Sequence, residues 1–383
     1  MREVVIVEAV RTPIGRRKGL LSGVRPDDMA GAVLKELVDR AGISPGIIED
    51  VIMGCVSQVG EQSLNVGRSA LLIADFPIHV PATTIDRQCG SSQQAVHFAA
   101  QAIMSGDMDV VVAAGVESMS RIPMGVARLE SDWSEQLYSR FELIPQGESA
   151  ERIADIWGFS RTQLDEFALE SHHKALLAQE EGRFDREIMS LEVTLPDGTK
   201  TTVTKDEGPR KDTSIEKLGT LKPAFIDNGK IHAGNSSQMS DGAGALLLMS
   251  KEKAEELGLK ARFRIVSRAV VGSDPTLMLT GPIEATFQAL KRANLTIDDM
   301  DLYEVNEAFA PVPMAWLVDT KANPRKLNVN GSAIALGHPL GASGARVMIT
   351  LMHELERTGG RYGLQAICEG AGMANATIIE RLD

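Results

Sequence analysis

The chain turns from strand to helix within Pro81-Ala-Thr-Thr-Ile-Asp-Arg-Gln-Cys89-Gly-Ser-Ser-Gln-Gln-Ala-Val-His-Phe-Ala-Ala100. The β-branched run Thr83-Thr-Ile85 predicts the strand, and small and apolar residues at helical spacing from Ala95 onward predict the helix. Cys89 therefore lies where a helix begins, close to unpaired N–H groups and the positive end of the helix dipole. Both features favour a thiolate, the nucleophilic form of cysteine. The alternative is a structural cysteine, because free cysteines are usually buried.

Strands and helices on either side of this stretch form an order that occurs twice. A strand over 4–10 and a helix over 27–41 come before it, and a wholly apolar strand over 109–115 follows it. The second half of the chain repeats helix, strand, strand, helix and strand at 281–293, 296–304, 328–333, 344–355 and 362–370. The sequence therefore predicts two similar α/β halves.

Residues 120–242 interrupt this order and are predicted to be an inserted domain. They contain helices over 147–157 and 161–181, and a hairpin over 191–203 that turns at Asp197-Gly198. The predicted organisation is a first half, the insertion and a second half, formed by 1–119 with 243–252, by 120–242 and by 253–383.

The composition is ordinary for a soluble globular protein, with 43% hydrophobic and 24% charged residues. A net charge of −12 argues against nucleic acid as a general partner. The three cysteines, Cys55, Cys89 and Cys368, cannot make a disulfide framework, which favours the reducing cytoplasm. We expect no leader peptide and no membrane-spanning segment, because the chain opens with a strand pattern and has no long apolar run.

Asn306 and His338 lie in two stretches of the second half that are typical of sites. Asn306 follows an apolar strand, where its amide can hold a water or an oxyanion; a helix N-cap is the alternative role. His338 lies in the glycine-rich stretch Gly331-Ser-Ala-Ile-Ala-Leu-Gly-His-Pro-Leu-Gly-Ala-Ser-Gly344, where a rigid loop can hold an imidazole against substrate. Imidazole is the usual base for a thiol proton near neutral pH.

Cys368 ends a predicted buried strand and is followed by Glu369-Gly370-Ala-Gly372. Backbone N–H groups at such a turn can form an oxyanion hole. One thiolate can carry an acyl group while a second thiol exchanges a proton with carbon. A nucleophile with a separate thiol acid indicates Claisen-type cleavage or formation of a carbon–carbon bond. Cys55 lacks such a setting and is predicted to pack in a strand, while the His172-His173 pair is predicted to be solvated.

The chain resembles the thiolases, the acetyl-CoA C-acyltransferases, over essentially its whole length. Besides the Cys89 stretch, the resemblance rests on residues 7–15, 115–119, 233–243, 305–309, 330–344 and 368–370. It implies an α/β thiolase fold, a five-layer αβαβα sandwich of two βαβαβαββ halves with an inserted loop domain. It also implies assembly as a homodimer or homotetramer.

The resemblance implies a role for each residue of the site. Cys89 would be the acylated nucleophile, and His338 would take its proton and face the thioester oxygen of the acetyl unit. Asn306 would hold a water that completes this first oxyanion hole. Cys368 would protonate the leaving acetyl-CoA enolate, and the N–H groups of Cys89 and Gly370 would form a second oxyanion hole.

Coenzyme A would be a co-substrate, with no tightly bound cofactor and no metal. It would lie along the insertion, with Ser237 near its pantetheine arm and Arg210, Lys211 and Lys222 as candidates for its phosphates. The implied reaction is thiolytic cleavage of a 3-ketoacyl-CoA to acetyl-CoA and a shortened acyl-CoA, a step of fatty acid β-oxidation. The alternatives are biosynthetic condensation of two acetyl-CoA molecules to acetoacetyl-CoA, and a non-catalytic protein that binds acyl-CoA.

Two departures from the family pattern concern the surroundings of the site. Pro145-Gln146-Gly147-Glu148 replaces a Met-Gly pair that lines the acyl pocket in well-known members. Glu369 and Ala371 stand where many members have an apolar residue and glycine. We therefore expect an acyl group that is of medium length, branched or otherwise unusual.

Overall fold

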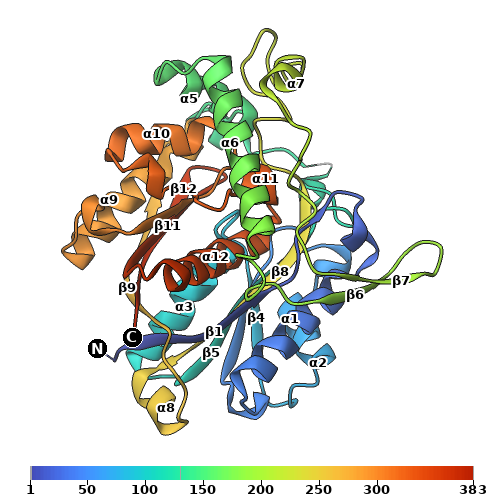
Figure 1. Cartoon of the computed structure of the whole chain (residues 1–383), viewed down its shortest axis with the longest axis vertical. Coiled ribbons are helices and arrows are strands. Elements are labelled where there is room, and N and C mark those ends of the chain that lie inside the picture. The colour runs from blue at the N-terminus through green and yellow to red at the C-terminus, as the bar shows by residue number, and fades with distance from the viewer. Residues whose placement is uncertain (1, 130, 383) are drawn as a thin grey trace.

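Apolar strands form the centre of the computed structural model, which describes residues 2–129 and 131–382 (Figure 1). The strands of the main sheet are β1 (Val4–Arg11), β2 (Gly15–Arg16), β3 (Asp50–Gly54), β4 (Ala82–Ile85), β5 (Val110–Ser118), β8 (Ser240–Ser250), β9 (Phe263–Gly272), β10 (Leu302–Val305), β11 (Tyr362–Glu369) and β12 (Met373–Arg381). Hydrogen bonds connect them in the order β10-β11-β12-β9-β1-β8-β5-β3-β4, with β2 beside β8. Only two residue pairs join β1 to β9, so the sheet has two parts, one from each half of the chain.

Helices connect these strands in the predicted repeated order, except that the second half has no strand at 328–333. The first half has α1 (Pro26–Ala41), α2 (Val66–Ile73) and α3 (Ser91–Ser105), and α8 (Lys251–Glu256) leads to the second half, which has α9 (Gly281–Ala293), α10 (Pro311–Thr320), α11 (Ala333–Leu336) and α12 (Ser343–Thr358). The pattern strand–helix three times, followed by two strands, is complete in the first half.

The helices α3 and α12 lie between the two parts of the sheet (Figure 1). Val96 of α3 and Met348 of α12 share one buried core with Ile6 of the first part and Ile265 of the second. The outer face of the first part packs against α1 and α2, and the outer face of the second part packs against α9 and α10. The result is five layers, helix, sheet, helix, sheet and helix, with the starts of α3 and α12 brought together in the middle.

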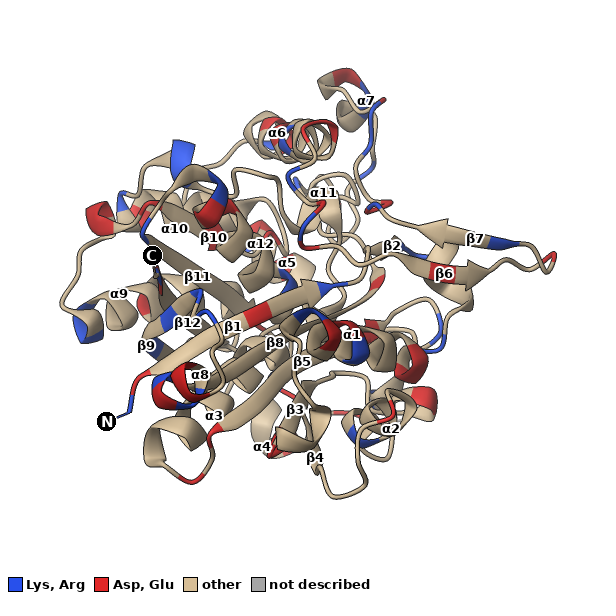
Figure 2. Ribbon diagram, turned by 60° about the horizontal axis from the view of Figure 1, so that its bottom comes forward, with Lys and Arg blue, Asp and Glu red and all other residues tan. Residues whose placement is uncertain are grey.

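Between β5 and β8 the chain leaves the sheet and forms a separate set of short elements. These are α4 (Glu135–Tyr138), α5 (Gln146–Ile156), α6 (Arg161–Glu180), β6 (Leu191–Thr194), β7 (Lys200–Val203) and α7 (Ile215–Gly219). The strands β6 and β7 form the predicted hairpin, and Gly198 at its tip has a φ of 83°. The hairpin projects from the body of the molecule (Figure 2).

Residues 328–333 do not form the strand predicted there. A single bridge joins Leu327 to Tyr303, and Asn328 and Gly331 have φ values of 45° and 70°. The side chain of Asn328 instead accepts from the N–H of Val305 and donates to its C=O, both at 2.9 Å. These side-chain bonds replace a strand ladder, and the left-handed backbone ends the extended structure.

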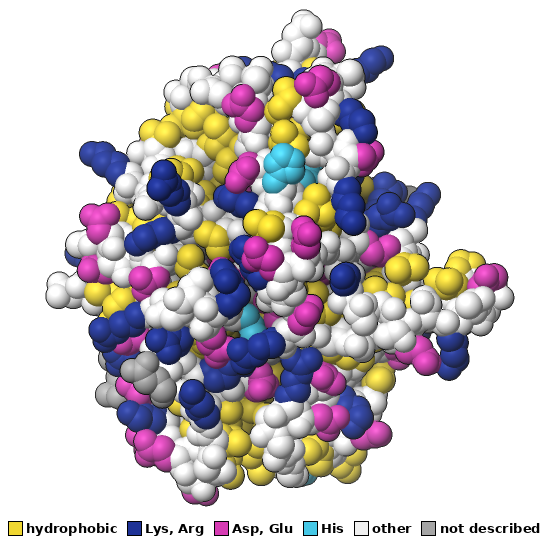
Figure 3. All heavy atoms as spheres, in the orientation of Figure 1, with side chains coloured by type: hydrophobic (Ala, Val, Ile, Leu, Met, Phe, Trp, Pro, Cys, Tyr) yellow, Lys and Arg dark blue, Asp and Glu magenta, His cyan; other side chains and the backbone are white. Residues whose placement is uncertain are grey.

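Charged residues lie mainly on the outer helices and loops, while the central strands contain few of them (Figure 2). Positive and negative groups alternate over the face shown in Figure 3. Among the described residues, no helix combines the length and the apolar character that crossing a bilayer requires.

Candidate active site

Cys89 lies in the turn between β4 and α3, two residues before the first helical residue. The hydroxyl of Ser91 closes this turn, because it accepts from the N–H of Arg87 at 2.9 Å and donates to the C=O of Gln88 at 2.6 Å. Gln88 has a φ of 48°, in the left-handed region that a sharp turn requires. The Cys89 side chain is 5% exposed. Its apolar neighbours are Met119, Leu340 and Ile367.

The prediction that the helix start favours a thiolate is wrong for the resting protein. Burial and then the charge of Glu369 raise the pKa of Cys89 to about 12. The charges of Glu117 and Asp86 raise its pKa further. Cys89 is therefore a protonated thiol at neutral pH and needs a base to become a nucleophile.

His338 has the hydrogen bonds expected of such a base. It lies between α11 and α12, with its Nδ1 2.6 Å from the Oγ of Ser343. The Ser343 hydroxyl donates to the C=O of Pro339 at 2.8 Å, so its oxygen accepts the proton of Nδ1 and the lone pair of the ring is on Nε2. Burial and then the charge of Arg346 lower the pKa of His338 to about 3, which keeps the ring neutral and able to accept a proton.

Asn306 contacts the second ring nitrogen of His338, with its Nδ2 3.4 Å from Nε2. The Oδ1 atom of Asn306 is buried and has no hydrogen-bond partner within the described ranges. The backbone N–H of Asn306 donates to Ala366 of β11 at 3.0 Å, which fixes it beside the strand of Cys368. The alternative N-cap role is wrong, because the N-cap of α10 is Ala310. An unpaired buried amide oxygen here is suited to hold a water or a polar substrate atom.

Cys368, on β11, reaches the same site from the second half of the chain. It is 1% exposed and packs with Ala308 and Phe309, which follow Asn306. Cys89 belongs to the neighbouring apolar cluster, which includes Ile367, the residue before Cys368. Burial and then the charge of Cys89 raise the pKa of Cys368, so the two thiols are near enough to interact electrostatically. Asn306, which contacts His338, is bonded to Ala366, two residues before Cys368, and Leu340 of the His338 loop packs in the Cys89 cluster.

Gly370 begins the turn between β11 and β12, which continues through Ala371 and Gly372 at φ values of 66° and 81°. A Cβ atom at Gly370 would lie 3.1 Å from the Nε2 of Gln146 and 3.3 Å from the Oε1 of Gln88. The absence of a side chain therefore leaves the backbone of Gly370 accessible between these two amides, where a substrate oxygen can approach it.

Glycines let the loop that carries His338 lie directly on the Cys89 turn. A Cβ atom at Gly344 would lie 2.2 Å from the backbone nitrogen of Gln93 in α3, and one at Gly341 would lie 2.6 Å from the Cα of Cys55. Contacts this short exclude any larger residue at either position. The relative position of the base and the nucleophile is therefore set by main-chain packing.

Two positioning residues, Glu117 and Ser343, were missed by sequence reasoning. The buried Glu117 carboxylate accepts from the N–H groups of Val56 and Gly341, both at 2.9 Å, and of Ser57 at 3.1 Å. It thereby ties the end of β5 to the loop that carries His338. Its sequence signal is a charged residue that directly follows a wholly apolar strand. Ser343 gave no signal, because its role depends on the fold of the loop.

An apolar cleft of about 820 Å³ opens beside Gly370. Its walls come from the insertion, including Trp133, Phe141 and Ile144, and from the segment 273–278. The Arg128 guanidinium lies 3.6 Å from the centre of the Trp133 ring and covers one side. Pro145 and Gln146, predicted to lie at the acyl pocket, line this cleft.

The candidate CoA-binding residues lie outside this catalytic cluster. Ser237 is half-buried, and its N–H donates to the C=O of Ala308 at 2.9 Å, which places it behind the Asn306 segment. Arg210, Lys211 and Lys222 are exposed on the insertion, on either side of α7. Their assignment to CoA stays a prediction.

Two predictions about other residues are wrong. Cys55 is fully buried but lies just after β3 rather than in a strand. His172, predicted to be solvated, is 3% exposed, and its Nδ1 accepts from the N–H of Arg210 at 3.2 Å. The insertion loop that contains Arg210 covers this face of α6. The polar pattern of the helix alone does not indicate that the face is covered.

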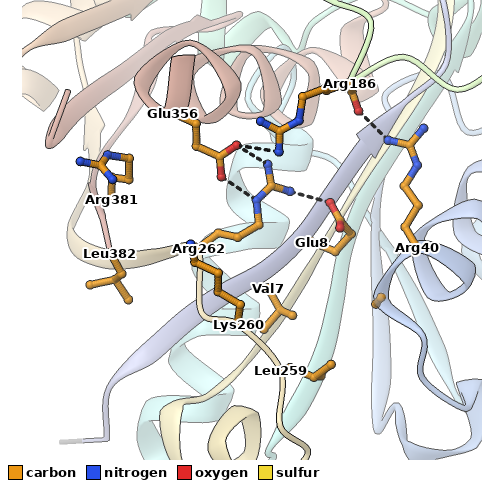
Figure 4. Close-up of a pocket in the computed structure, with 11 residues that line it drawn as sticks. Val7, Glu8, Arg40, Arg186, Leu259, Lys260, Arg262, Glu356, Arg381 and Leu382 are labelled. Carbon is orange, nitrogen blue, oxygen red and sulfur yellow. Dashed lines mark hydrogen bonds and ion pairs between the residues drawn. The ribbon is translucent and has the colours of Figure 1, made fainter. Parts of the chain in front are cut away.

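A second hollow, of about 490 Å³, lies beside α12 and the ends of α1 and β12 (Figure 4). Its arginines are paired within the wall: Arg262 contacts Glu8 and Glu356, and Arg186 contacts Glu356 at 3.2 Å. None of the predicted site residues lines it. The candidate active site is therefore the cluster at the starts of α3 and α12.

Two family models together match nearly the whole chain. They describe the N-terminal domain of thiolase, over residues 4–252, and the C-terminal domain of thiolase, over residues 259–381. The chain therefore belongs to the thiolase family. The predicted family, fold class and enzyme class, acyltransferase, are confirmed.

Individual relatives agree with this assignment. A steroid 3-ketoacyl-CoA thiolase of Mycobacterium tuberculosis is 47% identical over 100% of this chain and 95% of its own length. A 3-ketoacyl-CoA thiolase of Aliivibrio fischeri is 45% identical over 100% of both chains. The crystal structure of the Bacillus anthracis acetyl-CoA acetyltransferase superposes with a TM-score of 0.93 at 40% identity, covering 100% of this chain and 99% of that one.

Proposed function

We propose that this protein is a 3-ketoacyl-CoA thiolase that cleaves its substrate with CoA to give acetyl-CoA and an acyl-CoA shortened by two carbons. The observation that carries the proposal is that Cys89 and Cys368, from opposite halves of the chain, are both buried and act on each other electrostatically, while Leu340 of the His338 loop packs in the Cys89 cluster. Full-length relatives at 45% and 47% identity that are 3-ketoacyl-CoA thiolases support it.

In the proposed first step, the Cys89 sulfur attacks the 3-keto carbon while the Nε2 of His338 takes the thiol proton. Burial opposes a separated thiolate and imidazolium, so proton transfer accompanies the attack rather than preceding it. The bond between C2 and C3 then breaks, and Cys368 gives its proton to the acetyl-CoA enolate. An oxyanion at the thioester of this acetyl unit is stabilised by His338 and by a water held on Asn306.

In the proposed second step, the Cys368 thiolate takes the proton of the CoA thiol, and CoA attacks the acyl-Cys89 thioester. The N–H groups of Cys89 and Gly370 stabilise the oxyanion of this step. Cys89 leaves as a thiolate and recovers its proton from His338, which restores the starting state. CoA lies along the insertion, with Ser237 near its pantetheine arm and Arg210, Lys211 and Lys222 near its phosphates.

We assign the apolar cleft beside Gly370 to the acyl group. Its volume of about 820 Å³ lies within the usual range for sites that enclose a drug-sized ligand. Its aromatic and aliphatic walls favour a bulky apolar acyl group over a four-carbon one. The likeness to a steroid 3-ketoacyl-CoA thiolase supports the same substrate class.

A panel of 3-ketoacyl-CoA thioesters, from four carbons to fused-ring acyl groups, tests this function. We expect CoA-dependent release of acetyl-CoA, with the highest kcat/KM for a bulky member. Turnover of the four-carbon substrate alone would favour a biosynthetic acetoacetyl-CoA thiolase, which the structural match to an acetyl-CoA acetyltransferase keeps as the second candidate. No turnover of any member would favour the non-catalytic acyl-CoA-binding protein.

Narrowing the cleft is expected to change substrate preference. Ile144 is half-buried in the cleft wall, so Ile144→Trp should lower kcat/KM for bulky substrates about tenfold, the effect of overpacking a site by 1–3 kcal/mol. The four-carbon substrate should be unaffected. Ile156→Trp is the matched control, because Ile156 is 60% exposed and outside the cleft. Equal losses for all substrates would contradict the assignment.

The proposed setting is β-oxidation in the cytoplasm, with the enzyme as a homodimer or homotetramer. The edge strand β4 ends the sheet, and Leu64 and Ile78 nearby are 94% and 83% exposed. Exposed apolar residues beside an open strand edge support association with a second copy. Light scattering should give a mass two or four times that of the chain; a monomer at micromolar concentration would contradict this.

A further inference from the structure

Glu369 is a buried carboxyl group in the active site to which the proposed mechanism gives no role. It lies on β11 between Cys368 and Gly370 and is fully buried. Neither carboxylate oxygen has a hydrogen-bond partner among residues 2–129 and 131–382. A buried carboxylate without partners is costly, whereas the protonated acid is much less so.

The carboxyl group of Glu369 lies over the backbone of the nucleophile turn. A Cβ atom built on Gly90 would lie only 1.9 Å from its Oε1 and 2.8 Å from its Cδ. Gly90 directly follows Cys89, and Glu369 directly follows Cys368. The Glu369 carboxyl group therefore lies where the two cysteine-bearing segments contact each other. Its negative charge raises the pKa of both thiols.

The charged groups that face Glu369 compensate only part of the negative charge of its carboxylate. Arg87 and Asp86, both from the turn before Cys89, act on it with opposite sign. The Arg87 guanidinium donates to the Sδ of Met373 at 3.6 Å and makes no ion pair with Glu369 in the described part of the chain. Burial outweighs Arg87 and raises the pKa of Glu369 to about 8, so the group changes charge in mildly alkaline solution.

We propose that Glu369 is a positioning residue of the thiolase reaction, and that its carboxyl group must be uncharged for Cys89 and Cys368 to lose their protons readily. As an acid it places no charge beside the sulfurs. As a carboxylate it repels a thiolate in a buried site where water screens little. This role rests on the proposed function. Because the ionisation of Cys89 can be measured without substrate, the role of Glu369 and the thiolase function can be disproved independently of each other.

The pH dependence of Cys89 alkylation tests this role. Iodoacetamide modification of Cys89 is followed by peptide mass spectrometry in the full-length wild type, Glu369→Gln and Glu369→Asp. The rates of wild type and Glu369→Gln should agree at about pH 6, where both side chains are neutral. At about pH 9, Glu369→Gln should react about tenfold faster, corresponding to one pKa unit of the thiol. Glu369→Asp retains a carboxyl group and should behave as the wild type does.

Superimposable profiles for wild type and Glu369→Gln would overturn the proposal, as would a constant rate ratio across the whole pH range, which indicates only a structural change. If Glu369→Gln does not fold, Glu369→Leu replaces it, with the same expected ratio. In the wild type alone, the C=O stretch of a buried carboxylic acid should be present at about pH 6 and be lost by about pH 10. Its absence at the lower pH would also overturn the proposal.

Discussion

Cys89→Ser is expected to lower kcat for thiolysis on the order of 10⁴-fold, the loss typical of removing a covalent nucleophile. A serine hydroxyl is a much weaker acid than the thiol, so His338, whose pKa is lowered by burial, takes its proton far less readily. The negative charges of Glu117 and Asp86 act on position 89 and would oppose an alkoxide there. The measurement is the initial rate of acetyl-CoA release with saturating 3-ketoacyl-CoA and CoA.

The matched control for this variant is Cys55→Ala. Cys55 is also buried, and its backbone packs against Gly341 of the His338 loop, but its thiol has no place in the reaction. Its removal should lower thermal stability modestly and change kcat by no more than about twofold. Retention of a tenth or more of wild-type activity by Cys89→Ser would remove Cys89 as the nucleophile.

The order of strands and helices could be predicted because it depends on periodicity along the chain. The apolar run of β5 and the amphipathic face of α1 carry enough local signal to place these elements closely. Residues 328–333 were misassigned because their backbone depends on a partner, Val305, which the side chain of Asn328 finds only in the fold. Local propensity contains no information on that pairing.

The sequence indicated which residue types form the candidate site, but not their protonation states. Glycine and proline around His338 and the strand patterns at Asn306 and Cys368 were visible in the sequence, and the structure places these residues before α12, directly after β10 and near the end of β11. The protonation of Cys89 was predicted wrongly, because a helix start favours a thiolate only where burial and negative neighbours do not outweigh it. Glu369 comes from a strand far away in the sequence, so its effect on Cys89 appears only when the two segments are packed together.

Cys368→Ala is expected to separate the two halves of the reaction. The acetyl-CoA enolate would have no acid to protonate it, so carbon–carbon cleavage should fall on the order of 10³-fold, within the range for loss of a general acid. Attack of Cys89 on a simple acyl-CoA expels CoA, whose thiol is acidic enough to leave as a thiolate without a proton from Cys368, so His338 and the oxyanion hole at Gly370 suffice. The variant should therefore still form an acyl-enzyme from an acyl-CoA that lacks the 3-keto group.

Mass spectrometry of the protein mixed with a saturated acyl-CoA checks this separation. Wild type and Cys368→Ala should both gain the mass of one acyl group on the peptide that contains Cys89, and Cys89→Ser should gain none. Burial raises the pKa of Cys368 and keeps it an uncharged thiol, so its removal leaves the charges around Cys89 unchanged and acylation should not be slower for electrostatic reasons. Equal losses of acylation and of carbon–carbon cleavage in Cys368→Ala would contradict this prediction. Cys368 would then be needed to form the acyl-Cys89 thioester as well as to protonate the enolate.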